Sequence, residues 1–342
     1  MRRRALPRTV GRRVPGRRCP GCRCRRRSQP RYARFLLLSR RLWRYSLFVA
    51  LLHNSGAGDE AHSAEAIGSL IERAGHEFRH VSIDDPGWQH ALDRRYELVA
   101  IAGGDGTVGE VLTELGAASA GLVTILPLGS ANNIASAFGL GERTPEELIA
   151  GWSDAKKYRY RLGLAEAPER REAFVETVGG GLFAESILRA AAVETGDADK
   201  VELGLRLLRE LVDELPAHRW DVELDGVDHS GEFFGVEAMV IGDTGPKVPL
   251  TPAADPEDRL LDVVLIADRD RPQLAAYLDD RLSERRPGTL NLKTVRCTAA
   301  VLARPAEHSL RIDDTLWRDG GVDRGHVRAT LVPRPIEVLV PR

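Results

Sequence analysis

The stretch Ile101-Ala-Gly-Gly-Asp-Gly-Thr-Val-Gly109, followed by Glu110, decides how the rest of the chain is interpreted. Residues 96–102 (YELVAIA) before it form an apolar run typical of a buried strand, and residues 107–115 (TVGEVLTEL) after it have the apolar spacing of a helix. Glycines between a strand and a helix let backbone N–H groups approach an anion at the positive end of the helix. The loop therefore predicts phosphate binding, although no Gly-Lys-Ser/Thr of a Walker A loop follows it.

The same order of strand, loop and helix recurs around this stretch. Apolar strands are expected at 46–52 and 122–128, and they lead into polar, glycine-containing loops at 53–58 (HNSGAG) and 127–133 (PLGSANN). This alternation predicts a parallel sheet with helices on both faces and ligands at the carboxyl ends of the strands. We therefore expect a Rossmann-like α/β nucleotide-binding domain over residues 46–155.

The pattern changes in the second half of the chain. Residues 158–167, 171–181 and 231–242 have the composition of strands, and Asp225-Gly226 is typical of a hairpin turn. We expect a β-rich, mostly antiparallel, sandwich-like domain over residues 156–342. Its last strands could close this domain or return to the first sheet, and the sequence leaves both arrangements open.

Charge is distributed unevenly along the chain. Residues 1–45 contain 17 arginines and no acidic residue, so 49 minus 17 leaves 32 basic against 50 acidic residues in the remainder. An acidic remainder argues against a nucleic-acid-binding domain. We expect residues 1–45 to be a disordered extension: an arm for anionic lipid or nucleic acid, a targeting segment, or the product of a start codon assigned too far upstream.

The three loops together resemble the diacylglycerol kinase catalytic-domain family, which includes soluble bacterial lipid kinases. Its pattern is Asn near Ser-Gly, then GGDGT with a nearby Glu, then Pro-Leu-Gly-[Ser/Thr]-x-Asn. Residues 245–265 (GPKVPLTPAADPEDRLLDVVL) are similar to a further family segment, and the resemblance covers about residues 46–340. It implies ATP-dependent phosphorylation of a lipid hydroxyl, diacylglycerol-like, with Mg²⁺, in a cleft between the two domains.

The resemblance also implies roles for single residues. The residues that would bind the nucleotide lie in or beside the three loops: Asn54, Ser55, Gly56, Ser82, Gly103, Gly104, Asp105, Gly106, Thr107 and Ser130. A magnesium site is implied at Asp258, completed by the backbone carbonyls of Asp255 and Leu260. The base glutamate of the family's Asp-Gly-Glu motif falls on Asp313-Asp314-Thr315.

Three positions depart from the family's pattern. Thr315 stands in place of the base glutamate, Arg259 replaces the glycine after the metal aspartate, and Arg161 stands where Asp-Leu-Gly is usual. We therefore expect Asp314 to act as the catalytic base, with Asp313 orienting it. Asp105 is expected to act through a metal-bound water or to orient the glycine-rich loop. Loss of a general base would slow transfer without abolishing nucleotide binding.

Other functions remain open at this stage. The three departures permit a nucleotide- or lipid-binding homologue with impaired catalysis. NAD kinases share the GGDGT loop, but the chain has no Thr-Pro-Thr-Gly-Ser stretch. We expect a lipid substrate, transient peripheral membrane contact, a cytoplasmic location and no nucleic-acid partner; the sequence does not decide whether the protein forms a homodimer.

Overall fold

The computed structural model describes residues 46–54, 56, 62–93, 95–118, 121–168, 170–193, 200–317 and 326–342. The expected extension (residues 1–45) and Ser55 lie outside the described residues. The described residues all belong to one compact unit of the chain, which begins after Leu42.

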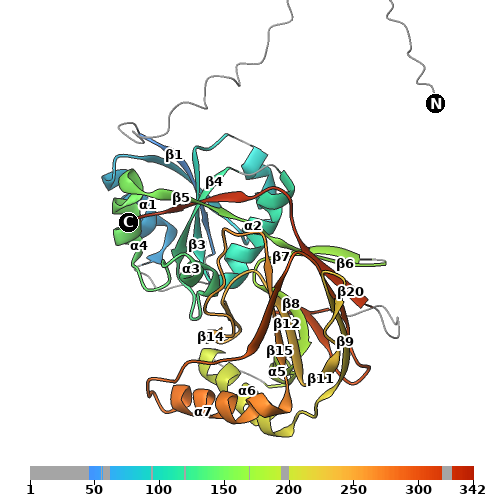
Figure 1. Cartoon of the computed structure of the whole chain (residues 1–342). Coiled ribbons are helices and arrows are strands. Elements are labelled where there is room, and N and C mark those ends of the chain that lie inside the picture. The colour runs from blue at the N-terminus through green and yellow to red at the C-terminus, as the bar shows by residue number, and fades with distance from the viewer. Residues whose placement is uncertain are drawn as a thin grey trace, which may run out of the picture. The chain divides into compact units, whose positions relative to one another are not determined.

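A six-stranded sheet, with the order β2-β1-β3-β4-β21-β5, carries the three loops (Figure 1). Its strands are β1 (Phe48–His53), β2 (Glu77–Ser82), β3 (Leu98–Gly103), β4 (Leu122–Pro127), β5 (Lys156–Tyr160) and β21 (Ile336–Val340). Strands β1 to β4 and β21 are parallel, and only β5 is antiparallel to its neighbour. β1, β3 and β4 are almost entirely buried, as expected for central strands of a parallel sheet that is covered on both faces.

Local sequence signals account for the helices of this part. They are α1 (Ala64–Arg73), η3 (Trp88–Asp93), α2 (Asp105–Ala118), α3 (Asn133–Ala137), α4 (Pro145–Ala150) and η4 (Trp152–Asp154). Ser63 caps α1 by accepting from the N–H of Ala66 at 3.2 Å. Thr144 and Glu147 form a capping box at the start of α4, with Pro145 in its first turn.

Two strands from the second half of the chain, β5 and β21, belong to this first sheet. β21 lies between β4 and β5, so the last strand of the chain returns to the first sheet. The segment 158–167, expected as one strand, is divided between β5 and β6 (Gly163–Ala167) with a break at Arg161-Leu162. The division of the chain into domains at residue 155 stays a prediction, but the first sheet extends beyond that position.

Two further sheets, both antiparallel, make up the rest of the strands. One has the order β10-β9-β17-β20-β6-β7, with β11 also pairing with β9. Its strands are β6, β7 (Arg170–Phe174), β9 (His218–Leu224), β10 (Val227–Asp228), β11 (Gly231–Phe233), β17 (Ala300–Ala303) and β20 (His326–Leu331).

The other antiparallel sheet has the order β16-β15-β12-β8-β18-β19. Its strands are β8 (Thr177–Gly181), β12 (Gly235–Met239), β15 (Leu261–Ile266), β16 (Lys293–Cys297), β18 (Leu310–Ile312) and β19 (Thr315–Trp317), and a separate pair is formed by β13 (Asp243–Thr244) and β14 (Val248–Pro249). The combination of a largely parallel sheet with antiparallel sheets confirms the mixed α/β class expected from the sequence.

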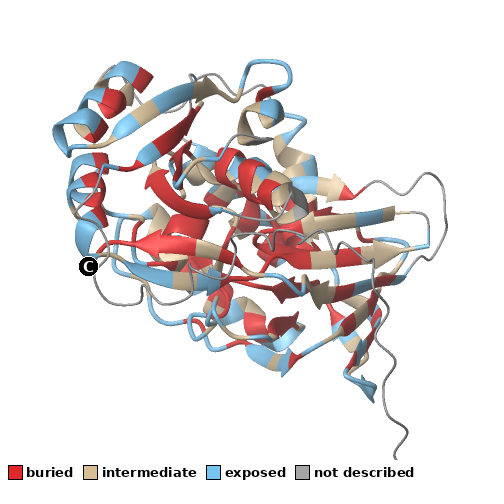
Figure 2. Ribbon diagram, turned by 90° about the horizontal axis from the view of Figure 1, so that it is seen from above, coloured by how far each residue is buried: buried red, intermediate tan, exposed pale blue. Residues whose placement is uncertain are grey.

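Helices α5 (Leu182–Ala190), α6 (Lys200–Glu214) and α7 (Arg271–Leu282) form a second apolar core with residues of β12, β14 and β15, and η5 (Asp268–Asp270) precedes α7. α6 and α7 lie side by side, and the apolar face of α6 at Leu205, Leu208 and Leu211 is buried. In Figure 2 the buried residues gather on the strands and on the inward faces of the helices. Within the described residues, no helix is long and apolar enough to cross a membrane.

Candidate active site

The three glycine-containing loops meet at one edge of the first sheet. They follow β1, β3 and β4, which are parallel neighbours, so their carboxyl ends point the same way. Asn54, after β1, donates from Nδ2 to Thr107 Oγ1 at 3.1 Å, and the N–H of Leu128 donates to the carbonyl of Gly103 at 3.0 Å. The meeting of loops expected from the sequence pattern is therefore present in the fold.

Two of these loops touch through their backbones at Gly104 and Gly129. A Cβ on Gly129 would lie 2.5 Å from the Cα of Gly104, closer than any side chain tolerates. Asn132 reinforces the approach: its amide accepts from the N–H of Gly129 at 3.0 Å and donates to the carbonyl of the same residue. Glycine at position 129 therefore sets the spacing between the GGDGT and PLGSANN loops.

Asp105 holds the same two loops together through its side chain. Its carboxylate accepts from the backbone N–H of Asn133 at 2.9 Å and of Ile134 at 3.0 Å, at the first turn of α3. Burial raises the pKa of Asp105 against the effect of these hydrogen bonds, and the nearby charge of Asp314 raises it further. Asp105 thus connects the glycine-rich loop to the start of α3, and its expected role in catalysis stays a prediction.

Asp313 stabilises the turn between β18 and β19. It adopts a left-handed backbone conformation (φ 50°), and its carboxylate accepts from the N–H groups of Val175 (3.0 Å), Glu176 (2.8 Å) and Thr177 (3.0 Å). Burial raises its pKa to about 6, although the three amide hydrogen bonds act in the opposite direction. A carboxylate committed to three amides is suited to positioning the turn and not to meeting a substrate.

Asp314, in contrast, is exposed and lies over the glycine-rich loop. Its Oδ2 is 4.0 Å from the position that a Cβ would take on Gly106, and its charge raises the pKa of Asp105. The hydroxyl of Thr315 is 3.4 Å from Asp314 Oδ1. The turn between β18 and β19 therefore places an accessible carboxylate next to the loop predicted to bind phosphate.

A buried carboxyl group that the sequence reasoning missed, Glu176, lies behind this loop. The Nδ2 of Asn133 is 3.4 Å from both of its oxygens, and Thr244 Oγ1 is 3.4 Å from one of them. Burial raises the pKa of Glu176 well above its usual value, and the charges of Asp105 and Asp313 act in the same direction. Glu176 is therefore a buried carboxyl group whose surroundings favour its neutral form.

Arg311 balances part of this negative charge from the strand β18. It is 1% exposed and donates from Nε to Glu237 Oε1 at 3.1 Å and from Nη2 to Thr244 Oγ1 at 2.8 Å. Glu237 also accepts from Thr177 Oγ1 at 2.8 Å. These charged residues interrupt strands that are otherwise apolar or rich in glycine, and that interruption is the sequence signal that would have revealed them.

Three further residues expected to bind the nucleotide lie in or beside the three loops: Gly56, Ser82 and Ser130. Gly56 donates its N–H to Asn54 Oδ1 at 2.8 Å, and Ser130 is exposed in the loop after β4. Ser82 ends β2 beside His53, and its hydroxyl accepts from the N–H of Asp84 at 3.3 Å. Their contact with a nucleotide stays a prediction.

The expected metal residues lie together in the turn before β15. The N–H of Asp258 donates to the carbonyl of Asp255 at 3.1 Å, and Asp258 Oδ1 accepts from the N–H of Leu260 at 2.8 Å. The second oxygen of Asp258 is paired with the guanidinium of Arg296. Within the described residues, no group of three or more His, Cys, Asp or Glu side chains could hold a metal ion. The single side chain expected to bind magnesium is thus engaged with Arg296, and the assignment stays a prediction.

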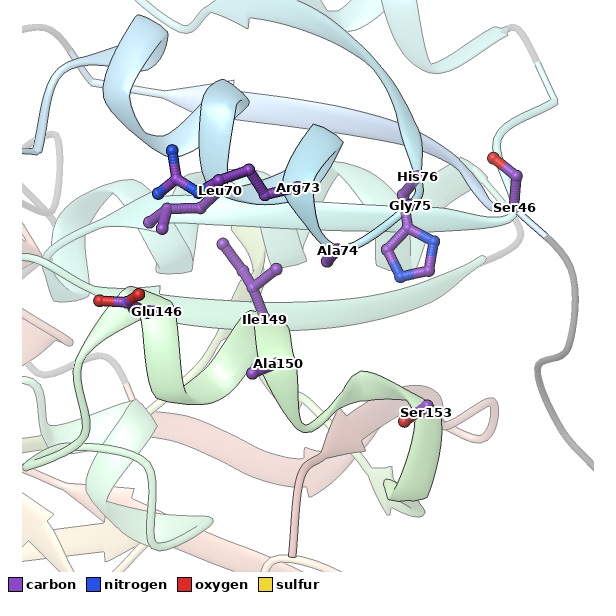
Figure 3. A pocket seen from close by; sticks show the side chains of 10 residues that line it. All are labelled: Ser46, Leu70, Arg73, Ala74, Gly75, His76, Glu146, Ile149, Ala150 and Ser153. Atoms are coloured by element: carbon purple, nitrogen blue, oxygen red, sulfur yellow. The ribbon is translucent and has the colours of Figure 1, made fainter.

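A cavity of about 460 Å³ lies at the opposite end of the first sheet (Figure 3). Residues from the start of β1, the end of α1 and the α4–η4 segment line it: Ser46, Leu70, Arg73, Ala74, Gly75, His76, Glu146, Ile149, Ala150 and Ser153. None of the residues expected to bind or react belongs to this lining. The cavity is therefore separate from the candidate site.

Residues 47–164 match the family model described as "Diacylglycerol kinase catalytic domain". The fold is similar to that of a diacylglycerol kinase from Bacillus anthracis str. Sterne, with 14% identity and a TM-score of 0.60 over 86% of this chain and 97% of that chain. It is also similar to yeast NADH kinase complexed with NADH, with 12% identity and a TM-score of 0.53 over 88% of this chain and 85% of that chain. No curated protein matches the chain. The family match confirms the resemblance over residues 47–164 and supports a phosphotransferase of the kinase type.

Proposed function

We propose that this protein is an ATP-dependent lipid kinase, because residues 47–164 match the family model of the diacylglycerol kinase catalytic domain. It transfers the γ-phosphoryl group of ATP to a hydroxyl of a diacylglycerol-like lipid, with Mg²⁺ accompanying the nucleotide. The observation that carries the proposal is the placing of Asp314 over Gly106, where an exposed carboxylate faces the loop that would hold the phosphates. The protein acts in the cytoplasm and contacts the membrane transiently to reach its substrate.

Catalysis of phosphoryl transfer depends mainly on positioning the reactants and on neutralising the negative charge of the phosphates. The backbone N–H groups of Gly103 to Thr107 and the N-terminus of α2 would hold the phosphate oxygens, and Mg²⁺ would supply further neutralisation. Asp314 accepts the proton of the lipid hydroxyl as it attacks. Asp313 acts as a positioning residue, because it fixes the turn that presents its neighbour.

The lipid substrate is favoured over NAD(H) by the loop that follows β4. Its sequence PLGSANN (residues 127–133) fits the lipid kinases, whereas the similarity to yeast NADH kinase is a similarity of fold. Incubation with radiolabelled ATP and Mg²⁺, with either diacylglycerol vesicles or NAD(H) as acceptor, separates the two. Label in the lipid phase supports the proposal, and label in the dinucleotide alone would replace it with NAD(H) kinase.

We predict that Asp314→Asn lowers kcat on the lipid by roughly 10²- to 10⁴-fold, because a general base contributes about that much. ATP affinity should stay within about threefold, since the amide cannot take a proton but preserves the shape of the turn. Asp221→Asn is the matched control, because it makes the same change at an exposed aspartate that pairs with Arg219 outside the candidate site. Full turnover of Asp314→Asn would remove Asp314 from the role of base. ATP binding by the wild type without transfer to any lipid would favour the catalytically impaired homologue.

A further inference from the structure

The turn between β7 and β8 contains a buried carboxyl group, Glu176, to which the proposed reaction assigns no role. The residue is 6% exposed. Segments that lie 43, 68 and 137 residues away along the chain meet it: Asn133 at the start of α3, Thr244 in β13, and Asp313 in the turn after β18. Glu176 therefore lies where the PLGSANN loop of the first sheet contacts the antiparallel part of the molecule.

No cation pairs with this carboxyl group. Within the described residues, no lysine, arginine or histidine forms an ion pair with Glu176, although Arg311 is buried nearby. Arg311 donates instead to Glu237 Oε1 at 3.1 Å, to Thr244 Oγ1 at 2.8 Å and to the carbonyl of Asp313 at 2.6 Å. Because burying a carboxylate without a cation is costly, these surroundings suit a neutral acid.

The hydrogen bonds around Glu176 also fit a neutral acid. Asn133 Nδ2 is 3.4 Å from both carboxyl oxygens and makes a shorter hydrogen bond, 3.0 Å, to the carbonyl of Gly245. A donor to a carboxylate usually lies closer, at about 2.7–2.9 Å. Asn133 Oδ1 is buried and, in the part of the chain that the structure describes, has no hydrogen-bond partner. A protonated Glu176 carries a hydroxyl donor beside this amide, whereas a carboxylate carries none.

The ionisable groups that act on Glu176 come from three parts of the fold: Asp105 in α2, Arg311 and Asp313 in and after β18, and Tyr160 in β5. Burial raises the pKa of Glu176 well above its usual value, the charges of Asp105 and Asp313 raise it further, and Arg311 acts in the opposite direction. Burial also raises the pKa of Tyr160, so its hydroxyl stays neutral and brings no positive charge. Negative charge thus outweighs positive charge around Glu176.

We infer that Glu176, held as a neutral acid, is a positioning residue that connects the PLGSANN loop to the turn carrying Asp314. The N–H of Asn133 donates to Asp105 at 2.9 Å, and the side-chain amide of Asn133 faces Glu176. The N–H of Glu176 in turn donates at 2.8 Å to Asp313, which precedes Asp314. An ionised Glu176 would add a negative charge near Asp105 and Asp313 and weaken this connection. The role in phosphoryl transfer rests on the proposed function.

The first test compares kcat of the full-length wild type, Glu176→Gln and Glu176→Leu with ATP, Mg²⁺ and diacylglycerol vesicles. Glutamine is neutral and keeps hydrogen-bonding atoms, so Glu176→Gln should transfer phosphate at the wild-type rate. Leucine forms no hydrogen bond, so Glu176→Leu should lower kcat about 10- to 100-fold, as a displacement of about 1 Å at the reacting groups can. Glu202→Gln is the control, since Glu202 is exposed on α6 and pairs with Arg206.

Rescue by glutamine distinguishes positioning from the filling of space. A folded Glu176→Leu with wild-type kcat would overturn the inference. A Glu176→Gln that loses as much activity as Glu176→Leu would also overturn it, because the carboxylate would then be the required form. The Tm of each variant shows whether it is folded. If Glu176→Leu has no thermal transition, the pH dependence of unfolding decides, because it needs only Glu176→Gln.

The second test follows urea unfolding of the wild type and Glu176→Gln between about pH 5 and 6.5. A glutamate that is neutral in the folded protein ionises on unfolding, where its pKa is about 4.3. Its stabilisation is therefore present at low pH and is lost as the pH rises. The unfolding constant of the wild type relative to Glu176→Gln should rise about tenfold per pH unit, whereas the ratio to Glu202→Gln should stay nearly constant. A ratio to Glu176→Gln that does not change with pH would show a charged Glu176 in the folded protein and overturn the inference.

The two tests also separate this inference from the proposed function. A wild type that transfers no phosphate to lipid defeats the proposed function and, with it, the role of Glu176 in transfer. The unfolding series would still establish or refute the neutral form of Glu176. A wild type that transfers phosphate, with kcat unchanged in Glu176→Leu, refutes the positioning role and leaves the proposed function in place.

Discussion

Asp313 and Asp314 are adjacent in sequence and have different environments. Asp313 accepts three backbone N–H groups, whereas Asp314 is exposed above Gly106. The left-handed conformation of Asp313 separates the directions of the two side chains. A pair of aspartates thus provides one residue that positions the turn and one that is proposed to take a proton.

At the residue scale, Asp313 should make stability depend on pH. Its pKa is raised from 3.8 to about 6 in the folded protein, so the folded state binds more protons between these values. Its contribution is therefore fully present below pH ~4 and is lost as the pH rises through about 6, on the order of 2–3 kcal/mol. Urea unfolding of wild type and Asp313→Asn at several pH values should show the wild type gaining stability relative to the variant as the pH falls from 6 to 4.

Asp221→Asn serves as the control for this pH series, because Asp221 is exposed and pairs loosely with Arg219 at 3.5 Å. The difference between wild type and this control should stay nearly constant over the same range. A difference between wild type and Asp313→Asn that does not change with pH would show that Asp313 titrates normally in the folded protein.

Two departures from the family's pattern, Arg161 and Arg259, lie far apart in the sequence, and the charge of Arg259 lowers the pKa of Arg161. The third departure, Thr315, directly follows Asp314, and its hydroxyl is 3.4 Å from Asp314 Oδ1.

At the element scale, the loops depend on how strands end. The segment 171–181, expected as one strand, is divided into β7 and β8 because the N–H groups of Val175, Glu176 and Thr177 turn toward Asp313. The loops after β1, β3 and β4 are brought together by the parallel pairing of these strands. The same hydrogen bonds to Asp313 therefore set the boundary between β7 and β8 and fix part of the geometry of the site.

We predict that Gly129→Ala lowers both the Tm and the affinity for ATP. The added methyl group would lie 2.5 Å from the Cα of Gly104, so the GGDGT and PLGSANN loops must move apart. Overpacking of this kind costs about 1–3 kcal/mol, and we expect ATP to bind at least about tenfold more weakly. Scanning calorimetry and nucleotide titration measure the two effects. In the control Gly121→Ala the new methyl group meets nothing within 4 Å, and wild-type ATP affinity in Gly129→Ala would contradict the assigned role of this contact.

At the scale of the whole molecule, β21 brings the C-terminal end of the chain back into the first sheet. This strand pairs with β4 on one side and β5 on the other, and Arg143 donates to the carbonyl of Pro341 at 2.8 Å. Lys247, in the segment between β13 and β14, pairs with Glu142 before α4. Residues far apart in the sequence thus connect the first sheet to the rest of the protein.

Truncation after Val332 should abolish cooperative folding. It removes four buried side chains, Ile336, Val338, Leu339 and Val340, and leaves β5 without a partner. At roughly 1.5–3 kcal/mol for each buried apolar side chain, the loss is comparable to a typical total stability of about 5–15 kcal/mol. Circular dichroism should show no sharp thermal transition, whereas removal of Arg342 alone should leave one. A sharp transition at the wild-type temperature in the truncated chain would show that the first sheet forms without β21.

The sequence by itself determined the α/β class, the three glycine-containing loops and the capped helices, because apolar periodicity, glycine and capping residues act over a few neighbouring positions. The resemblance of its motifs to those of the diacylglycerol kinase family also led to Asp105, Asp313 and Asp314.

Only the tertiary structure decided that β5 and β21 share the first sheet, that Asp314 lies over Gly106, and that Glu176 and Arg311 occupy the interior behind the loop. These relations join positions that are widely separated along the chain, and local patterns do not encode which strand pairs with which. The burial of the charged side chains at the site and their hydrogen-bond partners depend on that pairing of strands.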